Sequence, residues 1–110
     1  MSYDTRCRVA AFYLRDAMLD VNSYFNDQVK SIALVNQQGQ LTVGVMDVGD
    51  YTFSTGQHET MTVVSGALTV KLPGSDEWIT YASGERFDIA ANNSFDVKVE
   101  EQTAYLCQYR

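Results

Sequence analysis

The chain has 110 residues and a formal net charge of −6, with 45% hydrophobic and 12% aromatic residues. This length and composition allow one packed domain and exclude a second. The acidic balance and the scattered basic residues argue against nucleic-acid binding, and no apolar run approaches the roughly 20 residues that cross a bilayer. We therefore expect a cytoplasmic protein with neither a nucleic acid nor a membrane as partner.

The N-terminal segment, residues 1–17, differs from the rest of the chain. It holds three of the eight basic residues, and Val9, Phe12 and Tyr13 fall at helical spacing. We expect an extension, helical or disordered, that activity does not require. Residues 18–110 are assigned to a single domain.

From Gln28 onward the pattern is typical of an antiparallel all-β domain. Short segments rich in Val, Thr, Tyr and Phe alternate with clusters of Gly, Asn, Asp or Ser. Residues 68–72 and 95–99 alternate apolar and polar side chains, which predicts strands with one wet face. The spacing of turn signals at 37–40, 49–50, 65–66, 73–76 and 83–84 predicts about eight strands. A two-sheet jelly roll and a closed barrel both fit such a set.

The two cysteines, Cys7 and Cys107, make neither a disulfide framework nor the paired spacing of a zinc site. We expect both to be reduced thiols. The single histidine, His58, neighbours Glu59 and would point the opposite way on a strand. We interpret His58 as an exposed residue of a loop or strand end.

The segment from Gly49 through Glu59 to Gly66 resembles the first cupin motif, in which two histidines and a glutamate face into a β-barrel. Residues 52–55 stand where the histidines would be, and none is histidine; Phe95 stands at the third histidine position. Metal sites for iron, manganese, nickel or zinc normally need three or four well-placed ligands. We therefore expect a metal-free, single-domain cupin (jelly-roll) β-barrel.

Several longer strings carry a more specific resemblance. They are Val29-Lys30-Ser31-Ile32, VGVMDVGDYTFST (43–55), ETMTVVSGALTV (59–70), Trp78 to Tyr81, and TAYLCQY (103–109). Together they resemble the pyrimidine/purine nucleoside phosphorylase family from about Met18 to Arg110. The match departs at residues 90–92, Ala-Ala-Asn, where the family usually has a Pro-Gly turn. The resemblance implies a small bacterial cytoplasmic enzyme that uses inorganic phosphate to split nucleosides into free base and α-ribose 1-phosphate, with no other cofactor.

Phosphorolysis needs a phosphate site, a hold on the ribose and a place for the base. For phosphate, Lys30 is the basic residue within a matching string, and Thr52, Ser54 and Thr55 offer hydroxyl donors. A lone lysine on a strand is also a common surface charge. Arg86 is a weaker candidate because it lies outside those strings.

For the ribose we select Glu59, which the cupin pattern places inside the barrel, where a carboxylate must find hydrogen-bond partners. A structural acid bonded to backbone or tyrosine groups is the alternative. For the base, Tyr51 and Phe53 share one strand face, and Tyr105 and Tyr109 share another. These aromatics serve either as core or as a stacking surface, which would accept any base.

Met61 and Val63 continue the face of Glu59 and are interpreted as barrel lining. Trp78 is expected to cover the barrel mouth or a subunit contact, and a homodimer is the expected assembly because a domain of this size buries little surface alone. Two other readings stay open. One is a metal-free cupin that binds a sugar or nucleotide-like ligand without turnover, and the other is a metal-dependent dioxygenase or isomerase.

Overall fold

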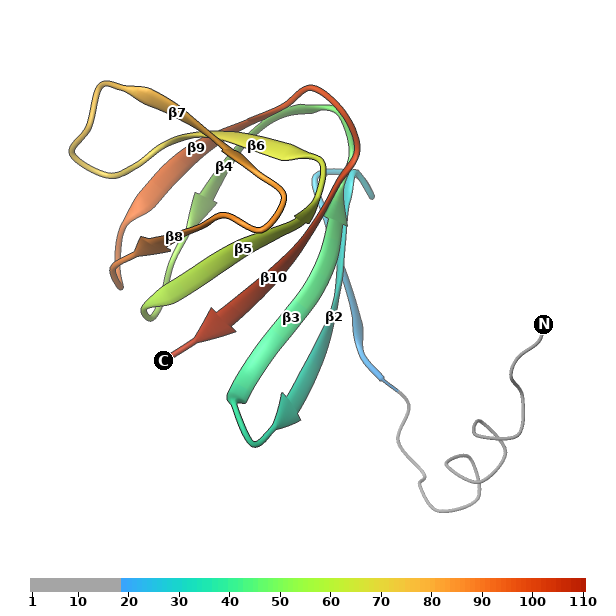
Figure 1. Cartoon of the computed structure of the whole chain (residues 1–110). Helices are drawn as coiled ribbons and strands as arrows, with labels where there is room; N and C mark the ends of the chain where they lie inside the picture. Colours follow the sequence, from blue (N-terminus) through green and yellow to red (C-terminus); the bar gives the residue numbers. More distant parts are fainter. Residues whose placement is uncertain (1–18) are drawn as a thin grey trace, which may run out of the picture.

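The computed structural model describes residues 19–110; the predicted extension and Cys7 lie outside the described residues (Figure 1). Ten strands form in the described part. They are β1 (Val21–Tyr24), β2 (Val29–Asn36), β3 (Gly39–Met46), β4 (Gly49–Ser54), β5 (Glu59–Ser65), β6 (Ala67–Lys71), β7 (Trp78–Ala82), β8 (Arg86–Ile89), β9 (Ser94–Val99) and β10 (Thr103–Tyr109). The all-β class is confirmed.

The strand number exceeds the eight or so expected, because some turns carry weak sequence signals. The turn after β1 is made by Phe25, Asn26 and Asp27, and the one after β8 runs through residues 90–93; neither contains Gly or Pro. The Gly49-Asp50 signal was wrong, since those two residues begin β4. Of the other four turn signals, those at 73–76 and 83–84 fall between strands, whereas 37–40 overlaps the start of β3 and 65–66 includes the last residue of β5.

The strands form two antiparallel sheets. One has six strands in the order β1-β2-β3-β10-β5-β8, and the other has four in the order β4-β9-β6-β7. In Figure 1 the four-stranded sheet lies across the top of the molecule, above β5, β10, β3 and β2. No ladder of strand pairing joins the two sheets among the described residues. The closed barrel is therefore not confirmed, and the strands have the two-sheet arrangement.

Apolar side chains from both inner faces make the core. Phe95, Val97 and Val99 of β9 and Leu68 and Val70 of β6 are all buried, as their alternation predicts. On the opposite sheet, Met61 and Val63 of β5 are buried as well, which confirms their inward direction. Because the strand period is two, the intervening residues face solvent.

The chain crosses from the six-stranded to the four-stranded sheet at Gly66, between β5 and β6. Gly66 has φ +98°, and a Cβ there would collide with Thr103. Thr103 is fully buried on β10; its hydroxyl donates to the carbonyl of Glu101 (2.8 Å) or Ala67 (3.0 Å) and accepts from the Ala67 N–H (3.1 Å). This one hydroxyl thus ties the crossover to β10.

Replacing that hydroxyl by a methyl group tests the tie. Thr103→Val keeps the shape but leaves the Ala67 N–H without its acceptor, so we expect a loss of about 1–3 kcal/mol in the free energy of unfolding, measured by urea titration. Thr80→Val is the control, because Thr80 is exposed and bonds only Thr69 across the outer surface (2.8 Å). Equal effects of the two changes would contradict the role given to Thr103.

Candidate functional site

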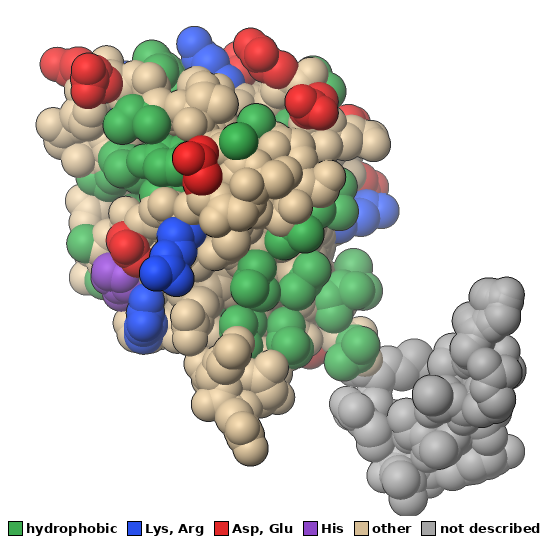
Figure 2. Space-filling model, in the orientation of Figure 1, with side chains coloured by type: hydrophobic (Ala, Val, Ile, Leu, Met, Phe, Trp, Pro, Cys, Tyr) green, Lys and Arg blue, Asp and Glu red, His purple; other side chains and the backbone are tan. Residues whose placement is uncertain are grey.

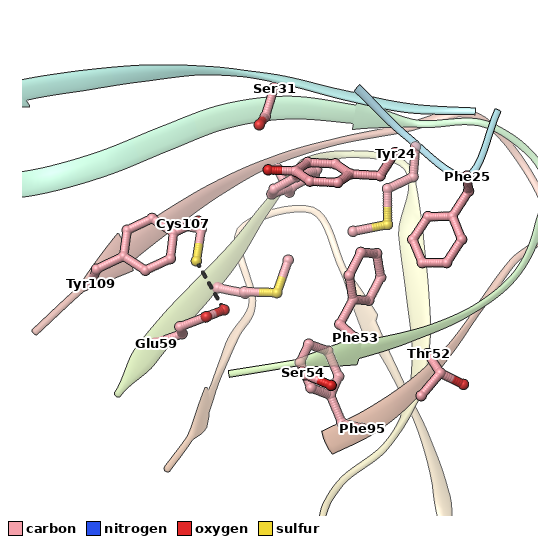
Figure 3. Close-up of a pocket in the computed structure, with 13 residues that line it drawn as sticks. Tyr24, Phe25, Ser31, Thr52, Phe53, Ser54, Glu59, Phe95, Cys107 and Tyr109 are labelled. Carbon is pink, nitrogen blue, oxygen red and sulfur yellow. Dashed lines mark hydrogen bonds between the residues drawn. The ribbon is translucent and has the colours of Figure 1, made fainter. Parts of the chain in front are cut away.

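A cavity of about 530 Å³ lies between the inner faces of the two sheets. Its walls come from β2, β3, β10 and β5 on one side and from β4 and β9 on the other. Tyr24, the last residue of β1, and Phe25 of the β1–β2 turn complete the lining. This volume lies in the range of small-molecule sites. Figure 3 shows carboxylate and thiol groups at one end and a group of phenylalanine rings at the other.

Glu59 defines the polar end. It is the first residue of β5 and pairs with Tyr109 of β10, and its Oε1 accepts a hydrogen bond from the Cys107 thiol at 3.5 Å (Figure 3). Burial raises the pKa of the Glu59 carboxyl, and the Cys107 hydrogen bond partly opposes that rise. Burial and the neighbouring Glu59 charge raise the pKa of Cys107 to about 12. The thiol is therefore a neutral donor at physiological pH.

Two tyrosine hydroxyls lie on the same strand as this thiol. Burial raises the pKa of Tyr105 to about 12, with a hydrogen bond to Ser31 acting in the other direction, and burial also raises the pKa of Tyr109. The Tyr109 hydroxyl is 3.0 Å from Thr42 Oγ1. Both phenols thus remain protonated and can donate hydrogen bonds to a bound ligand.

Gly44 of β3 lies directly beneath Tyr105. A Cβ at Gly44 would come within 2.6 Å of the ring Cζ and hydroxyl oxygen of Tyr105 and 2.7 Å of the Lys30 carbonyl oxygen. The tyrosine ring can lie flat against the sheet only because this position has no side chain. Gly44 therefore determines how close the Tyr105 ring lies to the sheet, and with it the depth of the cavity at this wall.

The aromatic end is built from rings of three different segments. Phe53 of β4 stacks on Phe95 of β9, with ring centroids 5.6 Å apart and an interplanar angle of 29°. Phe25 meets Phe53 edge to face at 5.4 Å and lies 5.0 Å from Tyr51. Aromatic walls of this kind suit flat, apolar ligand groups.

Charge is sparse in the cavity. Glu59 is the only Asp, Glu, Lys or Arg among the described residues that line it, and the remaining polar groups are hydroxyls and the thiol. Within residues 19–110, no three His, Cys, Asp or Glu side chains come together to hold a metal ion, and no helix could span a membrane.

Most of the residues selected from the sequence meet in this cavity. Those that line it are Thr52, Phe53, Ser54, Glu59, Met61, Tyr105 and Tyr109. Three of the four aromatic residues selected for the base therefore line one cavity. They are Phe53, Tyr105 and Tyr109.

Four other candidates lie outside the lining. Tyr51 is buried behind Phe25 and Phe53 and donates its hydroxyl to the Asp47 carbonyl (2.7 Å). Thr55 is also buried, and its hydroxyl donates to the Ala90 carbonyl (2.7 Å), where it supports the loop between β8 and β9. Lys30 and Arg86 are exposed. Lys30 alternates with the inward Ser31 and so points to the outer face of β2, and its role in phosphate binding stays a prediction.

His58 and Trp78 lie on outer surfaces. His58 precedes β5, and its Nε2 is 3.1 Å from Asp88 Oδ1, which confirms the strand-end position. Trp78 begins β7 with Lys98 Nζ 4.2 Å from its ring centroid, and it does not line the cavity. A subunit contact at Trp78 stays a prediction.

Several lining residues escaped the sequence reasoning: Tyr24, Phe25, Ser31, Met46, Phe95 and Cys107. Cys107 could have been found, because it falls between Tyr105 and Tyr109 in the same period-two series. Ser31 follows the buried Val29 in the same way. Phe25 could not, since it belongs to a turn, where no periodicity applies.

Comparison with known proteins decides the family. The model of the family described as pyrimidine/purine nucleoside phosphorylase matches residues 19–109. The chain belongs to that family. A pyrimidine/purine nucleoside phosphorylase of Hahella chejuensis is 61% identical over 92 residues, and one of Pseudomonas putida is 57% identical over 93; each alignment covers 84% of this chain and 99% of the relative.

Solved structures agree with the fold. A Vibrio parahaemolyticus protein of unknown function superposes with a TM-score of 0.80 at 52% identity, covering 86% of this chain and all of that one. A RmlC-like cupin from Shewanella frigidimarina, 14% identical, superposes with a TM-score of 0.66 over 83% of this chain and 82% of that one. The second likeness shows that the family has a cupin-like fold.

The raised pKa of Glu59 has a measurable consequence for stability. A folded state that holds the proton more tightly than the unfolded chain loses stability as pH rises from the ordinary value of 4.5 through the raised pKa. We expect Glu59→Gln to melt at a higher temperature than the wild type at pH 7, with the difference shrinking toward pH 4. Melting curves between pH 3.5 and 8 measure it.

The control is Glu100→Gln, because Glu100 is exposed on the surface. This variant should show no gain that grows with pH. A Glu59→Gln difference that is independent of pH, or reversed in sign, would contradict a partly buried carboxylate whose charged form is destabilised by the fold.

Proposed function

We propose that this chain catalyses phosphorolysis of purine and pyrimidine nucleosides. Phosphate forms a bond to the anomeric carbon, the bond from that carbon to the base nitrogen breaks, and the base leaves with the electron pair and takes up a proton. The products are the free base and α-ribose 1-phosphate. The observation that carries the proposal is a cavity with one partly buried carboxylate at one end and aromatic rings at the other, in a chain of this family.

Glu59 is assigned to the ribose. Its carboxylate can accept hydrogen bonds from sugar hydroxyls, and its negative charge would stabilise the positive charge that the ribose gains as the base departs. The Cys107 thiol orients one carboxylate oxygen and leaves the other free for the ligand. Neutral phenols at Tyr105 and Tyr109 supply donors beside it.

Phosphate is assigned to hydroxyl donors, with Lys30 as the competing candidate. Ser31 faces the cavity, whereas Lys30 points outward from β2. Thr52 and Ser54 lie at the rim of the cavity, because they are exposed and alternate with Tyr51 and Phe53, and the Thr52 hydroxyl donates to Asp96 at 2.7 Å. Hydroxyls bind phosphate more weakly than a cation does. We therefore expect a high KM for phosphate.

The first experiment incubates the purified chain with uridine or adenosine, with and without inorganic phosphate, and follows the free base by chromatography. We expect phosphate-dependent release of uracil and of adenine. Glu59→Ala should lower kcat/KM by about a hundredfold or more, as loss of a charge-stabilising group at a reacting centre does. Glu100→Ala is the matched surface control.

Each other result has a definite meaning. Release without phosphate would show a hydrolase, and saturable binding without product would show a binding protein; both contradict the proposal. Lys30→Ala is measured alongside. A rise in the KM for phosphate would support the lysine, and an unchanged value would leave phosphate to the hydroxyls.

We further propose that two copies pair through the outer face of the six-stranded sheet. Val21, Ile32, Val43 and Leu106 lie side by side on β1, β2, β3 and β10, and Val43 and Val45 are 46% and 50% exposed. Figure 2 shows hydrophobic side chains gathered over β2 and β3. In a two-fold dimer the same surface of each subunit faces its counterpart, so an apolar patch is buried against an identical apolar patch.

The distribution of charge also favours a second copy of this chain on the outer face of the six-stranded sheet. The chain carries a net charge of −6, yet no Asp or Glu occupies the outward positions of β2, β3 and β10. Two copies could therefore meet here without placing acidic groups against each other.

The free, buried thiol of Cys107 is consistent with the proposed cytoplasmic location.

Sedimentation at micromolar concentration tests the pairing. We expect a dimer for the wild type and a monomer for Val43→Glu, because the introduced charge would be buried against its own symmetry mate. Val35→Glu is the control, since Val35 is 76% exposed and belongs to the alternate positions of β2. A monomeric wild type, or a Val43→Glu dimer, would refute this interface.

A further inference from the structure

The turn between β1 and β2 has an unusual backbone. Phe25, Asn26 and Asp27 have φ of +54°, +56° and +70°, so three consecutive residues, none of them glycine, lie in the left-handed region. Single non-glycine residues visit this region uncommonly, and runs of them are disfavoured by contact between Cβ and the backbone. Something in the surrounding structure must therefore hold the turn.

Contacts on both sides of the turn hold it. The Ser23 hydroxyl donates to Asp27 Oδ1, and the Gln28 N–H donates to the Phe25 carbonyl at 3.2 Å. The carbonyl of Gln28 then accepts from the Asp47 N–H at 2.8 Å, which fastens the end of the turn to the residue after β3. These hydrogen bonds all form within the protein, so the turn keeps its conformation without a ligand.

The effect of this backbone is to aim the Phe25 ring into the cavity. Phe25 lines the cavity and points toward Phe53 in Figure 3, with its ring edge to face against Phe53 and beside Tyr51. Even so, Phe25 is 40% exposed. A large apolar side chain held by a strained turn yet left half open is placed for contact with something beyond the core.

We propose that Phe25 is the ring on which the nucleobase stacks and that the left-handed turn is the device that positions it. This rests on the proposed function. Phe53 is stacked on Phe95, and Tyr51 is buried with its hydroxyl bonded to Asp47. Tyr24 and Phe25 line the cavity and are 49% and 40% exposed, and of these two it is Phe25 that packs against the aromatic end. Figure 3 shows Phe25 and Glu59 at opposite ends of the cavity lining, so the proposal assigns the base to one end and the ribose to the other.

This assignment bears on specificity. Stacking uses the face of a base, which purines and pyrimidines share, whereas hydrogen bonds to base edges discriminate between them. Of the two rings beside Phe25, Phe53 is hydrocarbon and Tyr51 already donates its hydroxyl to the Asp47 carbonyl, so neither offers a donor to the edge of a base. The proposal therefore predicts broad acceptance of bases, with purines bound more tightly because their ring system is larger.

The direct test is calorimetric titration with adenosine and with uridine in the absence of phosphate. Phe25→Leu keeps an apolar side chain and loses the ring, so we expect affinity for both nucleosides to fall about tenfold, with the larger loss for adenosine. Phe25→Tyr keeps the ring and should restore binding. Val35→Ala, at an exposed position outside the cavity, is the control for general effects of substitution.

A second pair of variants tests the turn without touching the ring. Asp27→Gly and Asp27→Val both remove the bond from Ser23, but glycine accepts a positive φ and the β-branched valine resists it. We expect Asp27→Val to lose nucleoside affinity as Phe25→Leu does, and Asp27→Gly to bind about tenfold better than Asp27→Val. Thermal melts of both variants show whether the domain remains folded.

The outcomes separate this proposal from the proposed function. If the wild type releases base with phosphate and Phe25→Leu binds and reacts as the wild type does, Phe25 is not the stacking surface and the function stands. If nucleosides bind in a Phe25-dependent way without turnover, the stacking role stands and the phosphorolysis fails. A wild type that binds neither nucleoside overturns both, and equal affinities of the two Asp27 variants overturn the role of the turn.

Discussion

Side-chain packing between the two sheets, which no strand ladder joins within residues 19–110, is the constraint on which this structure depends. The inner faces supply alternating Val, Leu, Met and Phe, and burial of these side chains holds the sheets together. Toward the carboxylate end the filling is incomplete, and a cavity with one acidic group remains. Site and core are thus made by the same strands, and both follow from the inward positions of those strands.

Partial burial of Glu59 opposes stability at the place where the proposed chemistry would occur. A carboxylate in an apolar setting is destabilised in its charged form, and the single thiol donor from Cys107 is a weak partner for it. A ligand with hydroxyl groups would supply the further hydrogen-bond donors that the Glu59 carboxylate lacks in the protein. The neighbouring phenols are kept neutral by the same desolvation, so the polar end offers one acceptor and several donors.

Period-two alternation explains how much of this could be predicted from the sequence. Glu59 with Met61, and Tyr105 with Tyr109, were placed together because side chains two residues apart share a face, and the structure puts them in one cavity. Closure into a barrel could not be predicted, because it depends on which strands pair at the edges. Phe25 was missed because a turn has no period. The outward direction of Lys30 was not foreseen, because a matching string does not say which face a residue occupies, and its role in phosphate binding stays a prediction.

Gly44 shows that the depth of a cavity can be set from behind its wall. No ligand could touch this residue, which lies under Tyr105 on β3, yet the missing Cβ is what allows the ring to lie back. Among proteins with this arrangement of strands, the size of the accepted ligand could therefore change with every lining residue unaltered. A comparison restricted to the residues in contact with substrate would overlook such a change.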